Sequence, residues 1–200
     1  MANQNKTNIL AVHQLATPQE RAEGMQWYAI AQSIAQDIAT RYSLPEATVT
    51  AVLAALSPRN RWERNVADCE AICSAFVNGG SDQALAHKAC TFKSNKLKAI
   101  AALEDNLSTD EAALAILKGP KVSEFYRCIR GESDVCIDGH AWCIHQNDRR
   151  GLKEVPKITP KMRQAIKADY LAAAEAVGVT GYQMQAITWL AWRRIHGVTK

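Results

Sequence analysis

The sequence predicts an all-α protein, and three observations support this prediction. First, 48% of the 200 residues are hydrophobic, and alanine, the strongest helix former, is abundant. Second, apolar residues recur at intervals of three and four in one segment after another, which is the period of a helix face. Third, convincing strand patterns are missing, and 10 glycines and 6 prolines are too few for a loop-dominated fold.

Start and stop signals divide the first half of the chain into five helices. A capping box with proline at the first helical position, TPQE at 17–20, begins the first of them. The motif SPRN at 57–60 separates the second from the third, and NGG at 78–80 ends the third because glycine readily adopts helix-terminating conformations. The helices predicted here are 17–42, 46–56, 62–77, 81–87 and 93–103.

The second half of the chain contains similar helix start and stop signals. STDE at 108–111 forms a second capping box, and Lys118, Gly119 and Pro120 make a tight break. Asp138 stands where a helix N-cap belongs. The predicted helices are 108–117, 122–130, 139–146, 159–178 and 182–196, with a loop at 131–137 and a long polar loop at 147–158.

Composition and charge narrow the class of protein. The chain is long enough for one full core or for two small lobes around a cleft, and we expect a single compact unit over 1–200. A formal charge of +4 permits a nucleic-acid partner but fits a solvated basic surface equally well. The chain has no apolar run of about 20 residues, and its first residues lack a signal-peptide pattern, so we expect a cytoplasmic protein without membrane contact.

The six cysteines give no indication of a cofactor or a metal. No CxxC pair occurs, and without signs of secretion we expect reduced thiols. Cys136, His140, Cys143 and His145 are close in sequence, but their spacing matches no standard site. We therefore expect these four residues to serve in packing or in a catalytic site, with no metal and no cofactor bound.

Two residues at predicted helix starts have the chemistry of a catalytic pair. Lys121 follows a Gly-Pro turn, where the positive end of the helix dipole favours a neutral amine that can act as a Schiff-base nucleophile. Asp138 follows 138 − 121 = 17 residues later, and its carboxylate can guide protons or stabilise a cation. The alternative is an exposed helix-start lysine and a carboxylate that serves only as a cap.

The segments around this pair resemble the helix-hairpin-helix DNA glycosylases, the superfamily of endonuclease III and the oxoguanine glycosylases. LKGPKV at 117–122 is similar to a shortened form of their hairpin, and VCIDGHAW at 135–142 is similar to their Asp-x-His segment. Weaker similarities lie at 51–60, 91–100 and 185–192, so the resemblance covers residues 45–196 in order.

The resemblance implies a two-lobed helical fold with the active site in the cleft between the lobes, and a helix at 17–42 that packs with the C-terminal helices. Lys121 would attack C1′ of a deoxyribose whose damaged or modified base has been flipped out, with Asp138 activating it and stabilising the sugar. Both would face the same cleft. The imine would then allow strand cleavage, as in a bifunctional glycosylase and AP lyase of DNA repair.

The resemblance also implies a monomer that binds double-stranded DNA, in a bacterial nucleoid or a phage-infected host. Arg59 or Asn60 would fill the gap left by the flipped base. His140 would orient Asp138 or pack beside it, and Trp142 would serve either in the core or as a stacking platform. The residues that would contact DNA or line the pocket are Ser57, Arg59, Asn60, Lys96, Gly119, His140 and Trp142, with Lys93 and Lys98 on the same basic helix as Lys96.

Departures from the family pattern leave three functions open. The hairpin has Gly119-Pro120 in place of Gly-x-Gly, and proline has no N–H to offer a phosphate. The cysteine loop that holds an iron–sulfur cluster in endonuclease III-like members is missing. The chain is therefore a divergent glycosylase, a phage-type enzyme that attaches amino acids to DNA bases on the same scaffold, or a non-catalytic DNA-binding helical module.

Overall fold

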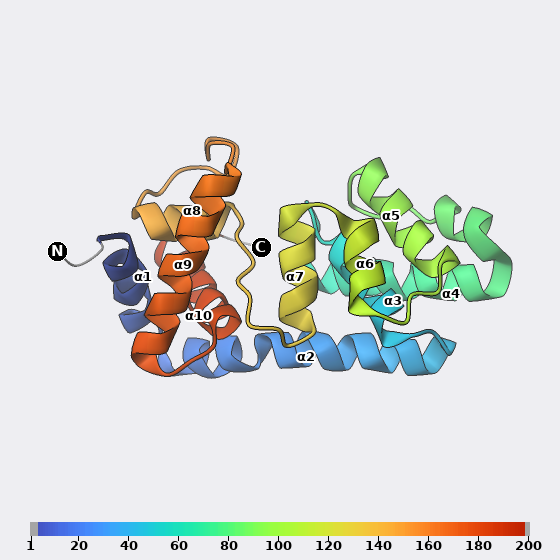
Figure 1. Cartoon of the computed structure of the whole chain (residues 1–200), viewed down its shortest axis with the longest axis horizontal. Helices are drawn as coiled ribbons and strands as arrows, with labels where there is room; N and C mark the ends of the chain where they lie inside the picture. The colour runs from blue at the N-terminus through green and yellow to red at the C-terminus, as the bar shows by residue number, and fades with distance from the viewer. Residues whose placement is uncertain (1–3, 199–200) are drawn as a thin grey trace. The chain divides into compact units, whose positions relative to one another are not determined.

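The computed structural model describes residues 4–198, and every regular element in that range is a helix (Figure 1). The prediction of an all-α fold is therefore confirmed. In chain order the helices are α1 (Gln4–Gln14), α2 (Pro18–Tyr42), α3 (Glu46–Leu56), α4 (Trp62–Ala86), α5 (Lys93–Glu104), α6 (Asp110–Leu117), α7 (Pro120–Ile129), α8 (Gly139–Gln146), α9 (Pro160–Val177) and α10 (Gly181–Ile195).

The residue contacts divide the chain into two compact units. Unit 1 consists of Met1–Ala29 and Gly131–Lys200, and unit 2 consists of Ile30–Arg130. Helix α2 contributes its first half to unit 1 and its second half to unit 2. Unit 1 is therefore assembled from the two ends of the chain, whereas unit 2 is one continuous segment.

Unit 2 is built around α3, whose residues from Ala47 to Leu56 are all buried. A helix that is apolar on all sides must be surrounded by other elements, and α4, α5, α6 and α7 pack against it. Side-chain hydrogen bonds also link α3 to its neighbouring segments. Asn65 Nδ2 donates to the Leu53 carbonyl at 3.0 Å, and Thr48 Oγ1 donates to the Leu107 carbonyl at 3.0 Å.

Unit 1 buries the inner faces of α1, α8, α9 and α10 in one hydrophobic core. The first half of α2 lies against α10, where Tyr28 Oη donates to Gln185 Oε1 at 2.9 Å. A Cβ atom at Gly24 would lie 2.7 Å from the Ile187 Cα atom, so only glycine permits this approach. The helix predicted at 17–42 thus packs with a C-terminal helix through its first half.

Most predicted helix boundaries agree with the structure. Thr17 and Glu20 form the expected capping box, and Asp138 caps α8 by accepting from the Ala141 amide at 2.9 Å. The cap of α6 lies one residue later than predicted, because Thr109 rather than Ser108 accepts from the backbone. The predicted break between two helices is a kink within α4, at Gly80 with φ +73°.

Helix α1 was not predicted, although its pattern was present in the sequence. Ile9, Val12 and His13 of α1 are buried, and their spacing of three and four residues is that of a helix face. Polar residues surround them, so the segment has low overall hydrophobicity. The face is recognised only when the other helices of unit 1 are present to cover it.

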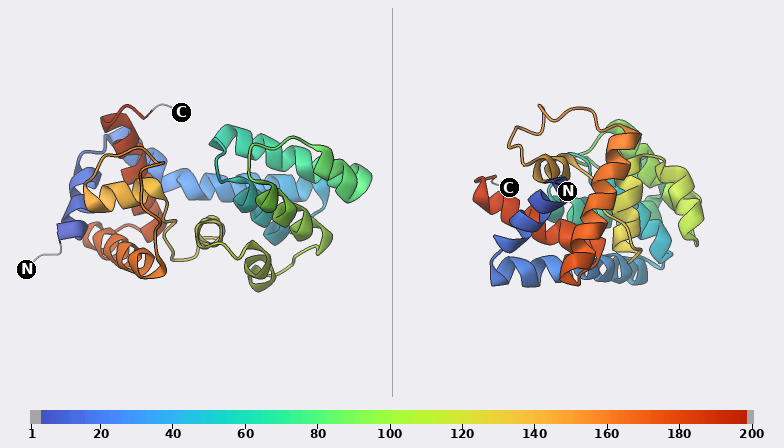
Figure 2. Two further views of the ribbon diagram at one scale, coloured as in Figure 1. Left: turned by 90° about the horizontal axis from the view of Figure 1, so that it is seen from above. Right: turned by 60° about the vertical axis from the view of Figure 1, so that its left-hand side comes forward.

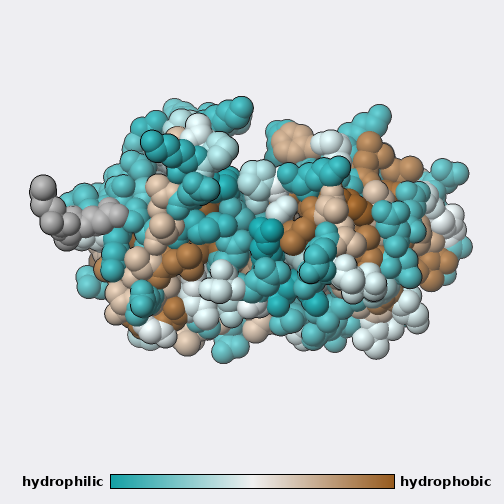
Figure 3. Space-filling model, in the orientation of Figure 1, coloured by the Kyte–Doolittle hydropathy of each residue, from teal (hydrophilic) through white to brown (hydrophobic). Residues whose placement is uncertain are grey.

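The face drawn in Figure 3 is mostly hydrophilic, with patches of apolar residues among the polar ones. Within residues 4–198, no helix combines the length and hydrophobicity needed to cross a membrane.

Candidate functional site

Helices α6 and α7 form a hairpin joined by only two residues, and the views in Figures 1 and 2 agree that they lie side by side. Lys118 ends α6 in the left-handed conformation (φ 51°), Gly119 is extended, and Pro120 begins α7. The Gly119 amide donates to the Leu117 carbonyl at 2.6 Å. With proline next, the turn therefore uses its amides internally, unlike a hairpin that holds a phosphate.

Cations gather at this hairpin. Lys98, on α5, donates from Nζ to the Leu117 carbonyl at 2.5 Å, where it satisfies the C-terminal end of α6. A Cβ atom at Gly119 would lie 3.8 Å from the same Nζ atom. Lys121 follows in the first turn of α7 and is half-buried. The predicted nucleophile is thus placed at a helix start, beside the hairpin, as the sequence suggested.

Asp138 lies at the start of α8 and is half-buried. Its Oδ1 atom accepts from the Ala141 amide, which fixes the carboxylate at the N-terminal end of that helix. His140 follows in the first turn of α8 and is also half-buried. Lys121 belongs to unit 2, while Asp138 and His140 belong to unit 1.

A buried carboxylate that the sequence did not predict organises the loop containing Ser57, Arg59 and Asn60. Asp68, on α4, is only 5% exposed. It accepts from Asn60 Nδ2 at 2.9 Å, from the Cys90 amide at 3.1 Å and contacts His87 Nε2 at 3.1 Å. Burial alone would raise the pKa of Asp68, but these hydrogen bonds outweigh it and hold the pKa below its usual value.

Of the three predicted residues in that loop, only Arg59 is exposed. It adopts φ +64°, and its guanidinium lies 5.1 Å from the centre of the Phe92 ring, which is itself 47% exposed. Ser57 Oγ donates to the Ala54 carbonyl at 2.9 Å, and Asn60 is held by Asp68. Ser57 and Asn60 are therefore held within the fold by these contacts, whereas the Arg59 side chain is exposed.

Lys96 also makes contacts within the fold. Its Nζ donates to the His87 carbonyl at 2.5 Å and to the Leu85 carbonyl, so the ammonium neutralises the carbonyl end of α4. Lys93, by contrast, lies at the start of α5 and is exposed.

Trp142 lies in the hydrophobic core of unit 1 and is 6% exposed. The Arg150 guanidinium covers its ring, 4.9 Å from the ring centre. Nearby, His145 Nε2 lies 2.8 Å from Asp169 Oδ2. Among residues 4–198, no cluster of three or more His, Cys, Asp and Glu side chains has the geometry of a metal site.

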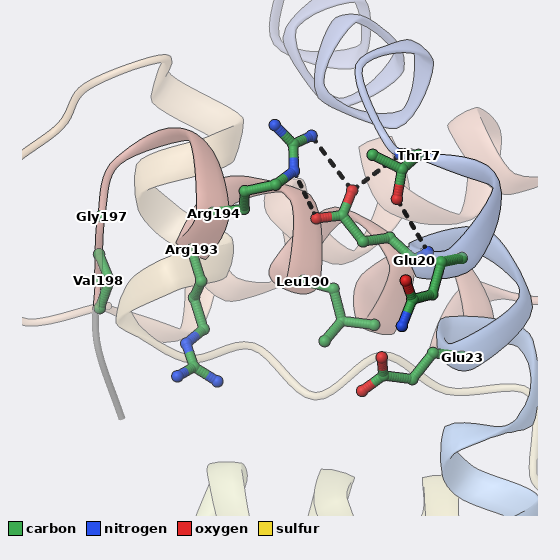
Figure 4. A pocket seen from close by; sticks show the side chains of 9 residues that line it. Thr17, Glu20, Glu23, Leu190, Arg193, Arg194, Gly197 and Val198 are labelled. Atoms are coloured by element: carbon green, nitrogen blue, oxygen red, sulfur yellow. Dashed lines mark hydrogen bonds and ion pairs between the residues drawn. The ribbon is translucent and has the colours of Figure 1, made fainter.

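A hollow of about 560 Å³ lies in unit 1 and is lined by residues from the start of α2 and the end of α10 (Figure 4). Arg194 forms an ion pair with Glu20 at 2.7 Å on its wall, and this interaction lowers the pKa of Glu20. The side chain of Leu190 lies between those of Glu23 and Arg193 in Figure 4. The remaining lining residues are Thr17, Gln19, Gly197 and Val198.

The fold and these sites define an all-helical protein with basic and acidic groups at helix starts. The chain belongs to a family of unknown function, DUF7178, which it matches over residues 1–196. Comparison with curated proteins and with solved structures gives no match.

Proposed function

We propose that the chain is a DNA glycosylase with AP-lyase activity, a divergent relative of the helix-hairpin-helix glycosylases. The observation that carries the proposal is the α6–α7 hairpin, which sets Lys121 in the first turn of α7, next to a turn that Lys98 makes electropositive. The capping position of Asp138 at α8 agrees with the Asp-x-His segment of those enzymes.

In the proposed reaction, Lys121 and Asp138 act on one extruded nucleotide. The Lys121 amine attacks C1′, the bond from C1′ to the base breaks, and the base leaves with the proton that the attacking nitrogen gives up. Ring opening gives an imine between Nζ and C1′. Loss of a proton from C2′ then expels the 3′-phosphate by β-elimination. The Asp138 carboxylate stabilises the positive charge that develops on the sugar.

The proposal is tested by borohydride trapping on duplexes that contain damaged or modified bases, because borohydride reduces the imine to a stable protein–DNA adduct. We expect Lys121→Gln to abolish trapping and to leave DNA binding intact, since an amide cannot form an imine. Lys118→Gln is the matched control: it removes a charge from the same hairpin and should still trap.

Asp138→Asn should fold, because asparagine caps helices nearly as well as aspartate. We expect the base-release rate to fall by roughly a hundredfold to a thousandfold, about 3–4 kcal/mol, because one electrostatic contact to the developing cation is lost. Trapping by Lys121→Gln, or full activity in Asp138→Asn, would contradict the assigned roles. A protein that binds DNA but never traps would favour the non-catalytic module.

The hollow in Figure 4 favours a second candidate, an enzyme that attaches an amino acid to a DNA base on the same scaffold. Such an enzyme needs a site for its second substrate, and Glu23 and Arg193 present opposite charges on either side of the apolar Leu190. An α-amino acid carries the complementary pair of charges. Incorporation of radiolabelled amino acids into DNA, reduced in Arg193→Ala, would support this candidate over base excision.

A further inference from the structure

The long loop between α8 and α9, residues 147–158, is basic, and none of its cations belongs to the DNA-contacting residues predicted from the sequence. It contains Arg149, Arg150, Lys153 and Lys157 against Asp148 and Glu154. In Figure 1 this loop passes above α8 on its way to the start of α9. It belongs entirely to unit 1.

Both acids of the loop are engaged within it. Asp148 forms an ion pair with Arg150, and Glu154 Oε2 accepts from the Gly151 amide at 2.8 Å. These bonds close the loop on itself and neutralise part of its charge locally. Lys153 and Lys157 are exposed, so the charge that faces outward is positive.

The loop is anchored at two points on unit 1. Arg150 lies over the Trp142 ring, and its carbonyl is 4.0 Å from Cys143 Sγ. Arg149 Nη2 donates to the His196 carbonyl at 2.8 Å, beyond the end of α10. The loop therefore has a defined position relative to α8, although it contains no helix longer than a turn.

Leu152 brings the loop onto the first turn of α8. A Cβ atom at Gly139 would lie 2.8 Å from Leu152 Cδ2 and 3.6 Å from Val155 Cγ2, so the loop covers the residue between Asp138 and His140. Leu152 nevertheless remains 55% exposed. An exposed leucine next to a lysine, over the first turn of α8, offers a sugar–phosphate strand one apolar and one cationic contact.

We propose that residues 147–158 are a nucleic-acid-binding strap, in which Lys153 and Lys157 contact phosphates and Leu152 contacts sugar next to Asp138. This proposal rests on the proposed function, because it assumes that DNA comes to Asp138. It adds a contact surface on unit 1 to the residues that the sequence predicted, Arg59 and Lys93, which are on unit 2.

The test is the salt dependence of binding to a fluorescent duplex. Each phosphate neutralised contributes close to 0.9 to the slope of log affinity against log salt concentration on duplex DNA. We expect Lys153→Ala/Lys157→Ala to reduce the slope by nearly two units with an unchanged melting temperature. The control Lys6→Ala/Arg41→Ala also removes two cations, both outside the strap, and should keep the wild-type slope.

Equal slopes for wild type and the strap variant would overturn the proposal, as would an equal loss in the control. Absence of any DNA binding by the wild type would overturn both the strap and the proposed function. DNA binding with a reduced slope in the strap variant, but without borohydride trapping, would support the strap and reject the glycosylase. Gly139→Ala gives an independent check: it should displace Leu152 and weaken binding without changing the slope by a full unit.

Discussion

The two units hold their interiors together by different means. Unit 2 surrounds one fully buried helix, α3, and fastens its loops to the buried carboxylate of Asp68. Unit 1 has no such central helix among its described residues; it joins the inner faces of four helices and relies on the close approach of α2 and α10 at Gly24. The comparison teaches where each unit tolerates least change: unit 1 at the close backbone approach of Gly24, and unit 2 at the hydrogen-bonded carboxylate of Asp68.

The largest expected effect is on unit 1. Gly24→Ala would place a Cβ atom 2.7 Å from the backbone N and Cα atoms of Ile187, and backbone cannot move aside as a side chain can. We expect a loss of about 3 kcal/mol of unfolding free energy, the upper range for overpacking. Hydrogen exchange resolved by peptide should show the loss in α10 and α2.

A matched control lies in unit 2. A Cβ atom at Gly79 would meet the Gln83 side chain, whose flexible end can rotate away, and would lie 3.1 Å from the Gln83 Cβ atom. Alanine also favours a helix over glycine by about 0.5–1 kcal/mol. Gly79→Ala should therefore leave stability unchanged or raise it, and a large loss in this variant would remove the distinction between the units.

The second largest effect concerns Asp68. Asp68→Ala leaves the Cys90 amide and the Asn60 side chain without their acceptor, at an expected cost of about 2–3 kcal/mol. Because the folded state lowers the pKa of Asp68, its contribution is complete above the unfolded value near 3.8 and is lost as pH falls through the lower folded value. Denaturant unfolding of wild type and variant should thus converge only in strong acid.

A smaller effect is expected at the surface of unit 1. Arg194 and Glu20 form an ion pair at 2.7 Å that also supports the capping box of α2. Exposed pairs of this kind contribute about 0.5–1 kcal/mol, and salt screens them. Glu20→Gln should lower the melting temperature slightly at low salt, and the difference should shrink at 1 M salt. A salt-independent difference would instead assign the effect to packing.

The smallest expected effect is a pH dependence of local stability that unit 1 shows and unit 2 does not. Burial, followed by the nearby Arg21 charge, lowers the pKa of His13 in unit 1. Its contribution is therefore complete above the unfolded value near 6.5 and is lost as pH falls below it. As pH falls from 7.5 to 5.5, the protection of α1 against hydrogen exchange, corrected for the pH dependence of the intrinsic exchange rate, should decrease, and His13→Gln should remove that decrease. Asp68 should leave the corrected protection of unit 2 unchanged over this range.

The local features of the fold could be predicted from the sequence because they depend on neighbouring residues. A capping box, a proline at a helix start or an aspartate before a helix needs no distant partner, and Glu20, Pro120 and Asp138 are where these rules place them. The all-α class follows from many such local signals acting together.

The tertiary structure alone decided which distant groups the charged side chains contact. The carbonyls that Lys96 and Lys98 cap belong to other helices, so their use within the fold is visible only once α4, α5 and α6 are packed. In the sequence, Asp68 is indistinguishable from any other charged residue on a helix. Its role is visible only from the hydrogen bonds that Asn60 and the Cys90 amide donate to it. Such contacts join residues far apart in sequence, and no local spacing encodes which distant group will satisfy a buried charge.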